Sequence, residues 1–141
     1  AVCHGAVDRA KLRDLISQDA NLLPKLEAII HPLAKADRED FIAKNPKSIL
    51  VFDIPLLFEL NSAADFDAVA CVLSSYEAQK SRVLARPGMT EDHFQLILSK
   101  QLPAEDKVER ADYIIDTNRH EAAALAVDAI LEDIKKRQKN A

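Results

Sequence analysis

The sequence predicts an α/β fold in which helices flank a parallel sheet, and two observations support this class. Three short apolar segments, 49–53, 67–73 and 112–116, have the composition of strands that are buried on both faces of a parallel sheet. Helical patterns separate these segments, which implies right-handed crossovers between parallel strands. The length of 141 residues suggests one domain, and 48% hydrophobic and 30% charged residues is an ordinary globular composition.

Helices are expected before the first apolar segment. Asp8 is a candidate N-cap for a helix over 9–17, and Asn21 is a candidate cap for the next helix. Pro32 predicts a kink or a restart in this second helix, whose apolar spacing continues to about Lys44.

The segment 49–53 is predicted to be a central strand, and it ends at a carboxylate. Pro55 prevents the ladder from continuing beyond Asp53. Open α/β sheets bind ligands at the carboxyl ends of their strands, so Asp53 is a candidate functional residue. The alternative is a capping carboxylate that accepts hydrogen bonds from backbone N–H groups in the turn.

Helices are also expected between and after the other two strands. The spacing of Ser74 and Glu77 is that of a capping box, and so is the spacing of Asn118 and Glu121. The predicted helices cover about 75–86, 90–101, 103–110 and the segment from Asn118 to the basic tail.

Charge and cysteine content exclude several classes of protein. The net charge of -4 argues against nucleic acid as the main partner, and no apolar run is long enough to cross a membrane. Cys3 and Cys71 do not make a disulfide framework, and a buried thiol in segment 67–73 favours the cytoplasm. Cys3 and His4 lack a second ligand pair at zinc spacing, so no metal site is expected.

Short motifs run in a recognisable order along most of the chain: 8–12 (DRAKL), 26–33 (LEAIIHPL), 53–59 (DIPLLFE), 82–86 (RVLAR), 101–103 (QLP), Lys107 and 111–116 (ADYIID). Their order and spacing resemble those of the dephospho-coenzyme A kinases, which are P-loop kinases. That family begins with a strand and a glycine-rich loop, whereas this sequence has only two glycines, Gly5 and Gly88. The chain therefore looks like the last two-thirds of the family, a single incomplete kinase-like domain over 1–141 without the N-terminal strand and loop.

The resemblance implies part of an enzyme that uses ATP and Mg²⁺ to phosphorylate the 3′-hydroxyl of dephospho-coenzyme A. A glycine-rich loop positions the phosphates in such enzymes, so this chain alone is expected to be inactive. The alternatives are a non-catalytic nucleotide-binding, coenzyme A-binding or regulatory module, and an unrelated α/β domain. A missing central strand would leave an unpaired sheet edge, so self-association is expected as well.

The resemblance also implies an acceptor pocket. Its expected members are Arg9, His31 and an apolar wall of Leu56, Leu57 and Phe58, which would suit the pantetheine arm of the substrate. The alternatives are an exposed arginine, a histidine bonded to the last carbonyls of a helix, and apolar residues that pack on the core.

A helical lid is expected over about 75–110. Arg82 and Arg86 are four residues apart, so one helix would point both the same way, and guanidinium groups there would clamp phosphates. The alternative is a solvated basic face. Gln101 and Lys107 are further candidates for phosphate binding, and a plain surface position is the alternative for each.

Two roles complete the site that the resemblance implies. Asp53 and Arg86 are the expected catalytic residues, and Asp53, His31 and the paired arginines are expected to face a common cavity. The loop 116–118, with Asn118 as its candidate residue, would border the adenine, and the alternative role of Asn118 is the N-cap of the last helix.

Overall fold

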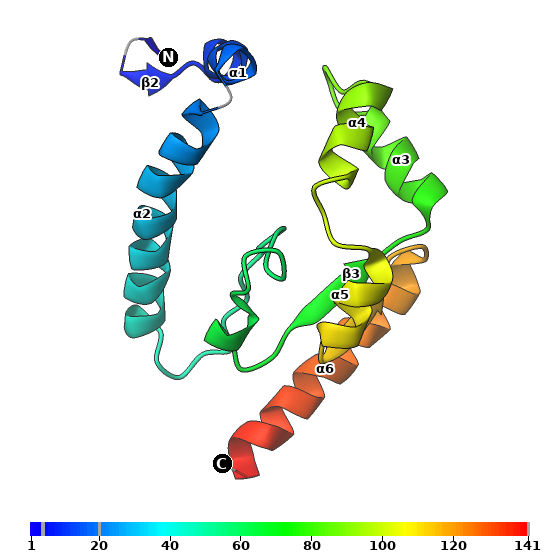
Figure 1. The fold of residues 1–141 in the computed structure, drawn as a ribbon. Coiled ribbons are helices and arrows are strands. Elements are labelled where there is room, and N and C mark those ends of the chain that lie inside the picture. The colour runs from blue at the N-terminus through cyan, green and yellow to red at the C-terminus, as the bar shows by residue number, and fades with distance from the viewer. Residues whose placement is uncertain (4, 20, 141) are drawn as a thin grey trace. The chain divides into compact units, whose positions relative to one another are not determined.

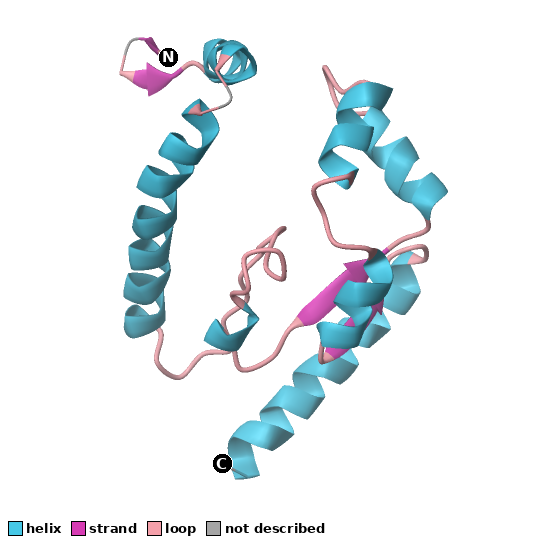
Figure 2. Cartoon of the chain, viewed as in Figure 1, coloured by secondary structure: helices cyan, strands magenta, loops and turns pink. Residues whose placement is uncertain are grey.

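The computed structural model describes residues 1–3, 5–19 and 21–140, which belong to two compact units, Ala1–Asp53 and Ile54–Ala141. Each unit is described by itself, and Figure 1 shows the order of their elements. Figure 2 shows that helices dominate both units. No helix in the described ranges combines the length and the apolar content that crossing a bilayer requires.

The first unit opens with a small hairpin that the sequence does not predict. Strands β1 (Val2–Cys3) and β2 (Ala6–Val7) pair antiparallel, and Gly5 adopts a φ of 80° in the turn between them. A two-residue strand is too short for the alternation of apolar and polar residues on which strand prediction depends. The structure describes neither the Cys3 side chain nor His4, so the expectation that these two residues form no metal site lies outside the described residues.

Two helices follow the hairpin. Helix α1 (Arg9–Gln18) begins at the expected cap, because the Asp8 carboxylate accepts a hydrogen bond from the Lys11 N–H at 3.0 Å. The next helix, α2 (Leu22–Lys44), continues through Pro32 instead of restarting there. Proline removes one N–H donor from the helix ladder, and the bonds on either side remain available.

Asn21 occupies the N-cap position of α2, as expected, but its side chain does not cap the helix. Asn21 has helical backbone angles and its side chain makes no capping hydrogen bond. Its backbone N–H instead donates to the Asp19 carboxylate at 2.9 Å. A residue already in the helical region does not aim its side chain at the N–H groups of the next turn, as a cap must.

The segment 49–53 is the main departure from the sequence prediction. It has no regular secondary structure, and Val51 is 84% exposed, so the predicted central strand is wrong for this structure. Phe52 packs edge-on against Phe41 of α2, with the ring centroids 6.0 Å apart. A strand requires ladder hydrogen bonds to a neighbour, and no described strand pairs with this segment. Asp53 consequently does not end a strand.

The second unit contains the predicted parallel pairing. Strands β3 (Ala70–Leu73) and β4 (Tyr113–Asp116) run parallel, with Cys71 opposite Ile114 and Leu73 opposite Asp116. The chain between and around them forms the short 3₁₀ helix η1 (Ala63–Asp65) and the helices α3 (Tyr76–Leu84), α4 (Glu91–Leu98), α5 (Ala104–Arg110) and α6 (His120–Asn140). The expected α/β class, a parallel sheet with flanking helices, is therefore confirmed.

The buried side chains of the second unit lie around β3 and α4. Phe58, Val69, Cys71 and Phe94 are each at most 9% exposed, and Cys71 is a free thiol, as expected. Burial raises the pKa of the Cys71 thiol, although Lys107 partly opposes this effect. Asp112 joins the starts of the two strands, because its carboxylate accepts a hydrogen bond from the Val69 N–H at 2.8 Å.

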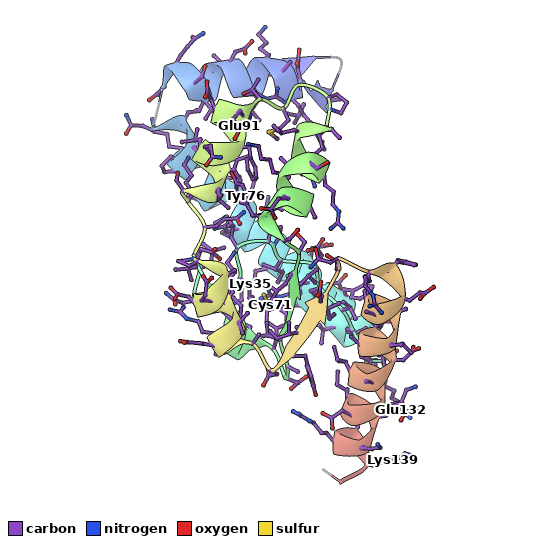
Figure 3. The ribbon with its side chains drawn as sticks, turned by 90° about the vertical axis from the view of Figure 1, so that its right-hand side faces the viewer. Lys35, Cys71, Tyr76, Glu91, Glu132 and Lys139 are labelled. Carbon is purple, nitrogen blue, oxygen red and sulfur yellow. The ribbon has the colours of Figure 1, made fainter. Side chains whose placement is uncertain are left out.

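Polar contacts attach the helices to each other and to the sheet. Figure 3 labels Tyr76 on α3 and Glu91 on α4, and the Gln95 amide donates to both of them at 3.0 Å. A further contact joins β4 to α6, because the Tyr113 hydroxyl donates to the Asp133 carboxylate at 2.5 Å. This bond raises the pKa of Tyr113 and lowers the pKa of Asp133.

Candidate functional site

A cavity of about 330 Å³ lies at the carboxyl ends of β3 and β4. Side chains from β3, α3 and α4 and the loops beside them form its walls. Its apolar members include Met89 and Phe94, and no described carboxylate lines it. The polar residues that line it are Ser74, Gln79, Arg82, Arg86, Gln101 and Thr117. Open α/β sheets bind ligands at this edge, so the position of the cavity agrees with the general rule. Asp53 was selected by the same rule, but it does not follow a strand in this structure.

Helix α3 carries Arg82 to the cavity. The helix is capped by Ser75, whose hydroxyl accepts from the Ala78 N–H at 3.2 Å, whereas the sequence places the cap at Ser74. Helices α3 and α4 pack against each other, as Figure 1 shows, and we call this pair the lid. Residues of the lid and of the strand ends line the cavity together.

Arg86 reaches the same cavity from a different setting than expected. Helix α3 ends at Leu84, so Arg86 lies in the turn that follows, and its N–H donates to the Val83 carbonyl at 3.1 Å. Gly88 completes this turn with a φ of 76°, a conformation that favours glycine. The expectation that both arginines extend from one helix is wrong, yet both line one cavity.

The two arginines differ in how they are held. The Arg82 guanidinium donates to the Thr117 carbonyl at 2.9 Å and to the Thr117 hydroxyl at 3.3 Å. Arg86 has no side-chain hydrogen bond or ion pair with any residue that the structure describes. The cavity therefore contains one anchored guanidinium and one that is free to move toward a ligand.

Thr117 lies in the loop 116–118 that the resemblance puts beside the adenine, and its sequence context predicts no separate role for it. Its N–H and its hydroxyl both donate to the Leu73 carbonyl at 2.8 Å, so it joins the end of β4 to the end of β3. A polar residue directly after an apolar strand is the signal that could have identified it.

Asn118 does not cap the last helix through its side chain. Its carboxamide oxygen accepts from the Ser75 N–H at 2.9 Å, and its amide nitrogen donates to Asp116 at 2.7 Å. The N-cap alternative is therefore wrong, because the strand end and the start of α3 already use this side chain.

Of the two weaker lid candidates, only Gln101 lines the cavity. The Lys107 ammonium lies 3.0 Å from the Glu59 carboxylate, and the two side chains are 16% and 14% exposed. A surface position for Lys107 is therefore wrong, and its charge is already paired.

Glu59 is the last residue of the motif 53–59, and the sequence predicts no role for it. Burial alone would raise the pKa of Glu59, but hydrogen bonds from the Leu102 N–H and from Lys107 outweigh burial and lower it. The carboxylate is thus ionised, and it joins the end of the motif 53–59 to the segment that follows α4.

The expected acceptor residues occupy several settings. Phe58 is 7% exposed and belongs to the core, Leu57 is half-buried, and Leu56 is 40% exposed in the turn over 55–60. Arg9 and His31 are exposed residues of α1 and α2.

The described residues that line the cavity all belong to the second unit, Ile54–Ala141. Arg9, His31 and Asp53 all belong to Ala1–Asp53, and Asp53 is exposed. That Asp53 and His31 face a cavity together with the arginines stays a prediction.

The cavity residues do not fit a resident Mg²⁺. This ion prefers carboxylate and other oxygen ligands, and the lining residues provide no carboxylate. Within the described residues, no group of three or more His, Cys, Asp or Glu side chains could hold a metal ion. The lining instead suits an anion with an apolar portion.

Comparison with known proteins gives consistent matches. The family model described as dephospho-CoA kinase matches residues 2–123. The dephospho-CoA kinase of Mesorhizobium japonicum is 49% identical over 138 residues, which cover 95% of this chain and 70% of that protein. The dephospho-CoA kinase of Ruegeria pomeroyi is 45% identical over 135 residues, which cover 96% of this chain and 68% of that protein.

A solved structure is similar over the same extent. The crystal structure of TT1252 from Thermus thermophilus matches with a TM-score of 0.77 and 28% identity, covering 94% of this chain and 70% of that one. The resemblance that the sequence motifs predict is thereby confirmed. The chain belongs to the dephospho-CoA kinase family, which is a family of kinase enzymes.

Proposed function

We propose that this chain forms part of a kinase that transfers the γ-phosphoryl group of ATP to the 3′-hydroxyl of dephospho-CoA. The observation that carries the proposal is the cavity at the carboxyl ends of β3 and β4, which two guanidinium groups line without any described carboxylate. Guanidinium groups bind phosphate oxygens through paired, charge-assisted hydrogen bonds. Membership of the family supports the identity of the substrates.

The lining residues divide by chemistry in a way that suits a nucleotide. Arg82 and Arg86 would bind phosphate oxygens, and the carboxamides of Gln79 and Gln101 add neutral hydrogen-bond donors and acceptors. Met89 offers apolar surface for the base or the sugar, and the buried Phe94 ring forms part of the cavity wall. Closure of the lid over this arrangement would exclude water, which protects the transferred group from hydrolysis.

The acceptor side of the proposal depends on the motif 53–59 and on the first unit. Leu56 and Leu57 provide accessible apolar surface for the pantetheine arm, whereas Phe58 supports them from the core. Arg9 and His31 would bind polar groups of dephospho-CoA, and Asp53 would orient the 3′-hydroxyl. In the transfer, this oxygen releases its proton and forms a bond to the γ-phosphorus, the bond from that phosphorus to the bridging oxygen breaks, and ADP leaves.

We further propose that these 141 residues alone bind ligands without enzyme-like turnover. Phosphoryl transfer depends on positioning and electrostatic stabilisation, which a glycine-rich loop supplies in P-loop kinases, and the sequence has only Gly5 and Gly88. A binding or regulatory module is the second candidate, because the cavity could hold a nucleotide without catalysing transfer. The buried free thiol of Cys71 supports a reducing compartment, so we place the protein in the cytoplasm.

Calorimetric titration of the chain with ATP, followed by an assay of ADP release with dephospho-CoA, tests these statements. We expect ATP to bind, inorganic triphosphate to compete with it, and ADP release to stay at background. Absence of ATP binding would contradict the cavity assignment, and enzyme-like turnover would contradict the predicted inactivity. The sequence upstream of the encoding region separates the two candidates, since a glycine-rich loop that ends in Lys-Ser or Lys-Thr supports the kinase.

A further inference from the structure

We infer that Thr117 is a positioning residue that fixes the Arg82 guanidinium at the cavity for phosphate binding. The inference rests on the proposed function, because it concerns the same cavity. The family resemblance puts the loop 116–118 beside the adenine but gives the Thr117 hydroxyl no role of its own. The geometry around its hydroxyl carries the argument.

The orientation of the Thr117 hydroxyl is set by the sheet. The hydroxyl donates its single proton to the Leu73 carbonyl at 2.8 Å, and the Thr117 N–H donates to the same carbonyl at 2.8 Å. A hydroxyl that has used its proton can only accept further hydrogen bonds. Its free lone pair is therefore available to a cation, and a β-branched side chain has few alternative rotamers.

Arg82 uses this acceptor. Its Nη1 lies 3.3 Å from the Thr117 hydroxyl and its Nη2 lies 2.9 Å from the Thr117 carbonyl. The guanidinium carries five N–H donors, and only these two bonds are made to described residues, so donors remain for a ligand. The two contacts also restrict rotation of the planar guanidinium group before a ligand binds. Binding then costs less conformational entropy than it would with a freely rotating arginine.

The same loop holds the first turn of α3. The Asn118 carboxamide oxygen accepts from the Ser75 N–H at 2.9 Å. The loop after β4 therefore contacts α3 at two places, at its start through Ser75 and near its C-terminal end through Arg82. These contacts fix the helix against the strand ends at two points. Arg86 has no comparable contact in the described part of the chain, so preorganisation is specific to Arg82.

Two substitutions separate the hydroxyl from the rest of the side chain. Thr117→Val keeps the shape and loses both hydroxyl bonds, and Thr117→Ser keeps the hydroxyl. In calorimetric titration with inorganic triphosphate, we expect Thr117→Val to weaken binding by about threefold to tenfold, the equivalent of one modest hydrogen bond. Thr117→Ser is expected to stay within about twofold of the unsubstituted chain.

A double-mutant cycle distinguishes positioning from general stabilisation. If Thr117 acts through Arg82, Thr117→Val has no further effect on triphosphate affinity in an Arg82→Ala background but keeps its effect in an Arg86→Ala background. An equal loss in the Arg82→Ala background would overturn the inference, and so would unchanged affinity in Thr117→Val.

A second measurement tests positioning without a ligand. Nuclear magnetic resonance of the Arg82 side-chain N–H groups should show slower rotation in the unsubstituted chain and in Thr117→Ser than in Thr117→Val, which keeps only the bond to the Thr117 carbonyl. Free rotation in the unsubstituted chain would overturn the inference. Failure of triphosphate to bind at all would instead contradict the proposed function, so the two failures are distinguishable.

Discussion

The Lys107 ammonium lies 3.0 Å from the Glu59 carboxylate, and this ion pair joins the motif 53–59 to helix α5. The same carboxylate oxygen accepts from the Leu102 N–H at 2.8 Å. Gln101, the neighbour of Leu102, lines the cavity. Glu59 therefore links the segment that contains Leu56 and Leu57 to the segment that follows α4.

Replacing Glu59 tests this link. Glu59→Gln removes the charge and leaves Lys107 mostly buried and unpaired, so we expect a loss of about 2 kcal/mol in the free energy of unfolding. Urea unfolding at neutral pH measures the loss. Glu39→Gln is the matched control, because its partner Lys35 is exposed and such pairs contribute about 0–1 kcal/mol. Equal losses in both variants would contradict a special role for Glu59.

The pH dependence of the same pair has a definite sign. The pKa of Glu59 is lower in the folded chain than its ordinary value of 4.5. A lowered carboxyl pKa contributes stability that is fully present above the unfolded value and is lost as the pH falls through the folded value. We therefore expect the stability difference between the unsubstituted chain and Glu59→Gln to be constant above about pH 5 and to shrink below 4.5. A difference that grows on acidification would contradict this assignment.

The two cavity arginines should both contribute to anion binding. Arg82→Ala and Arg86→Ala each remove one guanidinium, and we expect each to weaken ATP binding by about 1.5 kcal/mol, roughly tenfold. Arg110→Ala is the control, since Arg110 ends α5 and does not line the cavity. Calorimetric titration of the three variants decides the matter, and an effect of Arg110→Ala as large as the others would indicate only general charge attraction.

Phe94 supports both the lid and the cavity. It is 3% exposed, its ring centroid lies 6.0 Å from that of Tyr76, and it lines the cavity. Phe94→Ala should therefore cost about 3–5 kcal/mol of unfolding free energy. Leu96→Ala on the same helix removes a side chain that is 54% exposed and should cost much less. Similar shifts of the thermal midpoint in the two variants would show that α4 does not bury Phe94.

The Cys71 thiol should be unreactive in the folded chain. It is 8% exposed, and burial raises its pKa, so the reactive thiolate is rare near neutral pH. In a Cys3→Ser variant, which leaves Cys71 as the only thiol, we expect iodoacetamide to react slowly until urea unfolds the chain. Rapid alkylation without denaturant would refute the buried position of β3.

The parts of the fold that the sequence predicts well are those that local chemistry determines. Asp8 caps α1 because a carboxylate three residues before an N–H can reach it, whatever the rest of the chain does. The strands that contain Cys71 and Ile114 are predicted from their apolar composition. The prediction is confirmed because the two strands find their partner in each other, inside the second unit.

The errors arise where the outcome depends on a distant partner. The segment 49–53 has the composition of a buried strand, but composition cannot provide the neighbour that a strand requires. Likewise, the sequence shows Asn118 at capping distance from Glu121 but cannot show that Ser75 already uses its side chain. For Lys107 the sequence offers phosphate binding or a surface position, and it cannot show the ion pair because Glu59 is 48 residues away in the chain.

The family motifs found the lid arginines but not the residue that holds one of them. Arg82 and Arg86 were chosen for their charge and spacing, and both line the cavity. Thr117 has no charge, and its importance depends on bonds to Leu73 and Arg82 that only the folded chain reveals.

The most direct test of the account is a titration of the isotopically labelled chain with ATP, followed by nuclear magnetic resonance of its amide groups. The account predicts that the largest shifts occur at Ser74, Gln79, Gln101 and Thr117, which line the cavity at the ends of β3 and β4. Shifts confined to residues outside this cavity, or no shifts at saturating ATP, would contradict it.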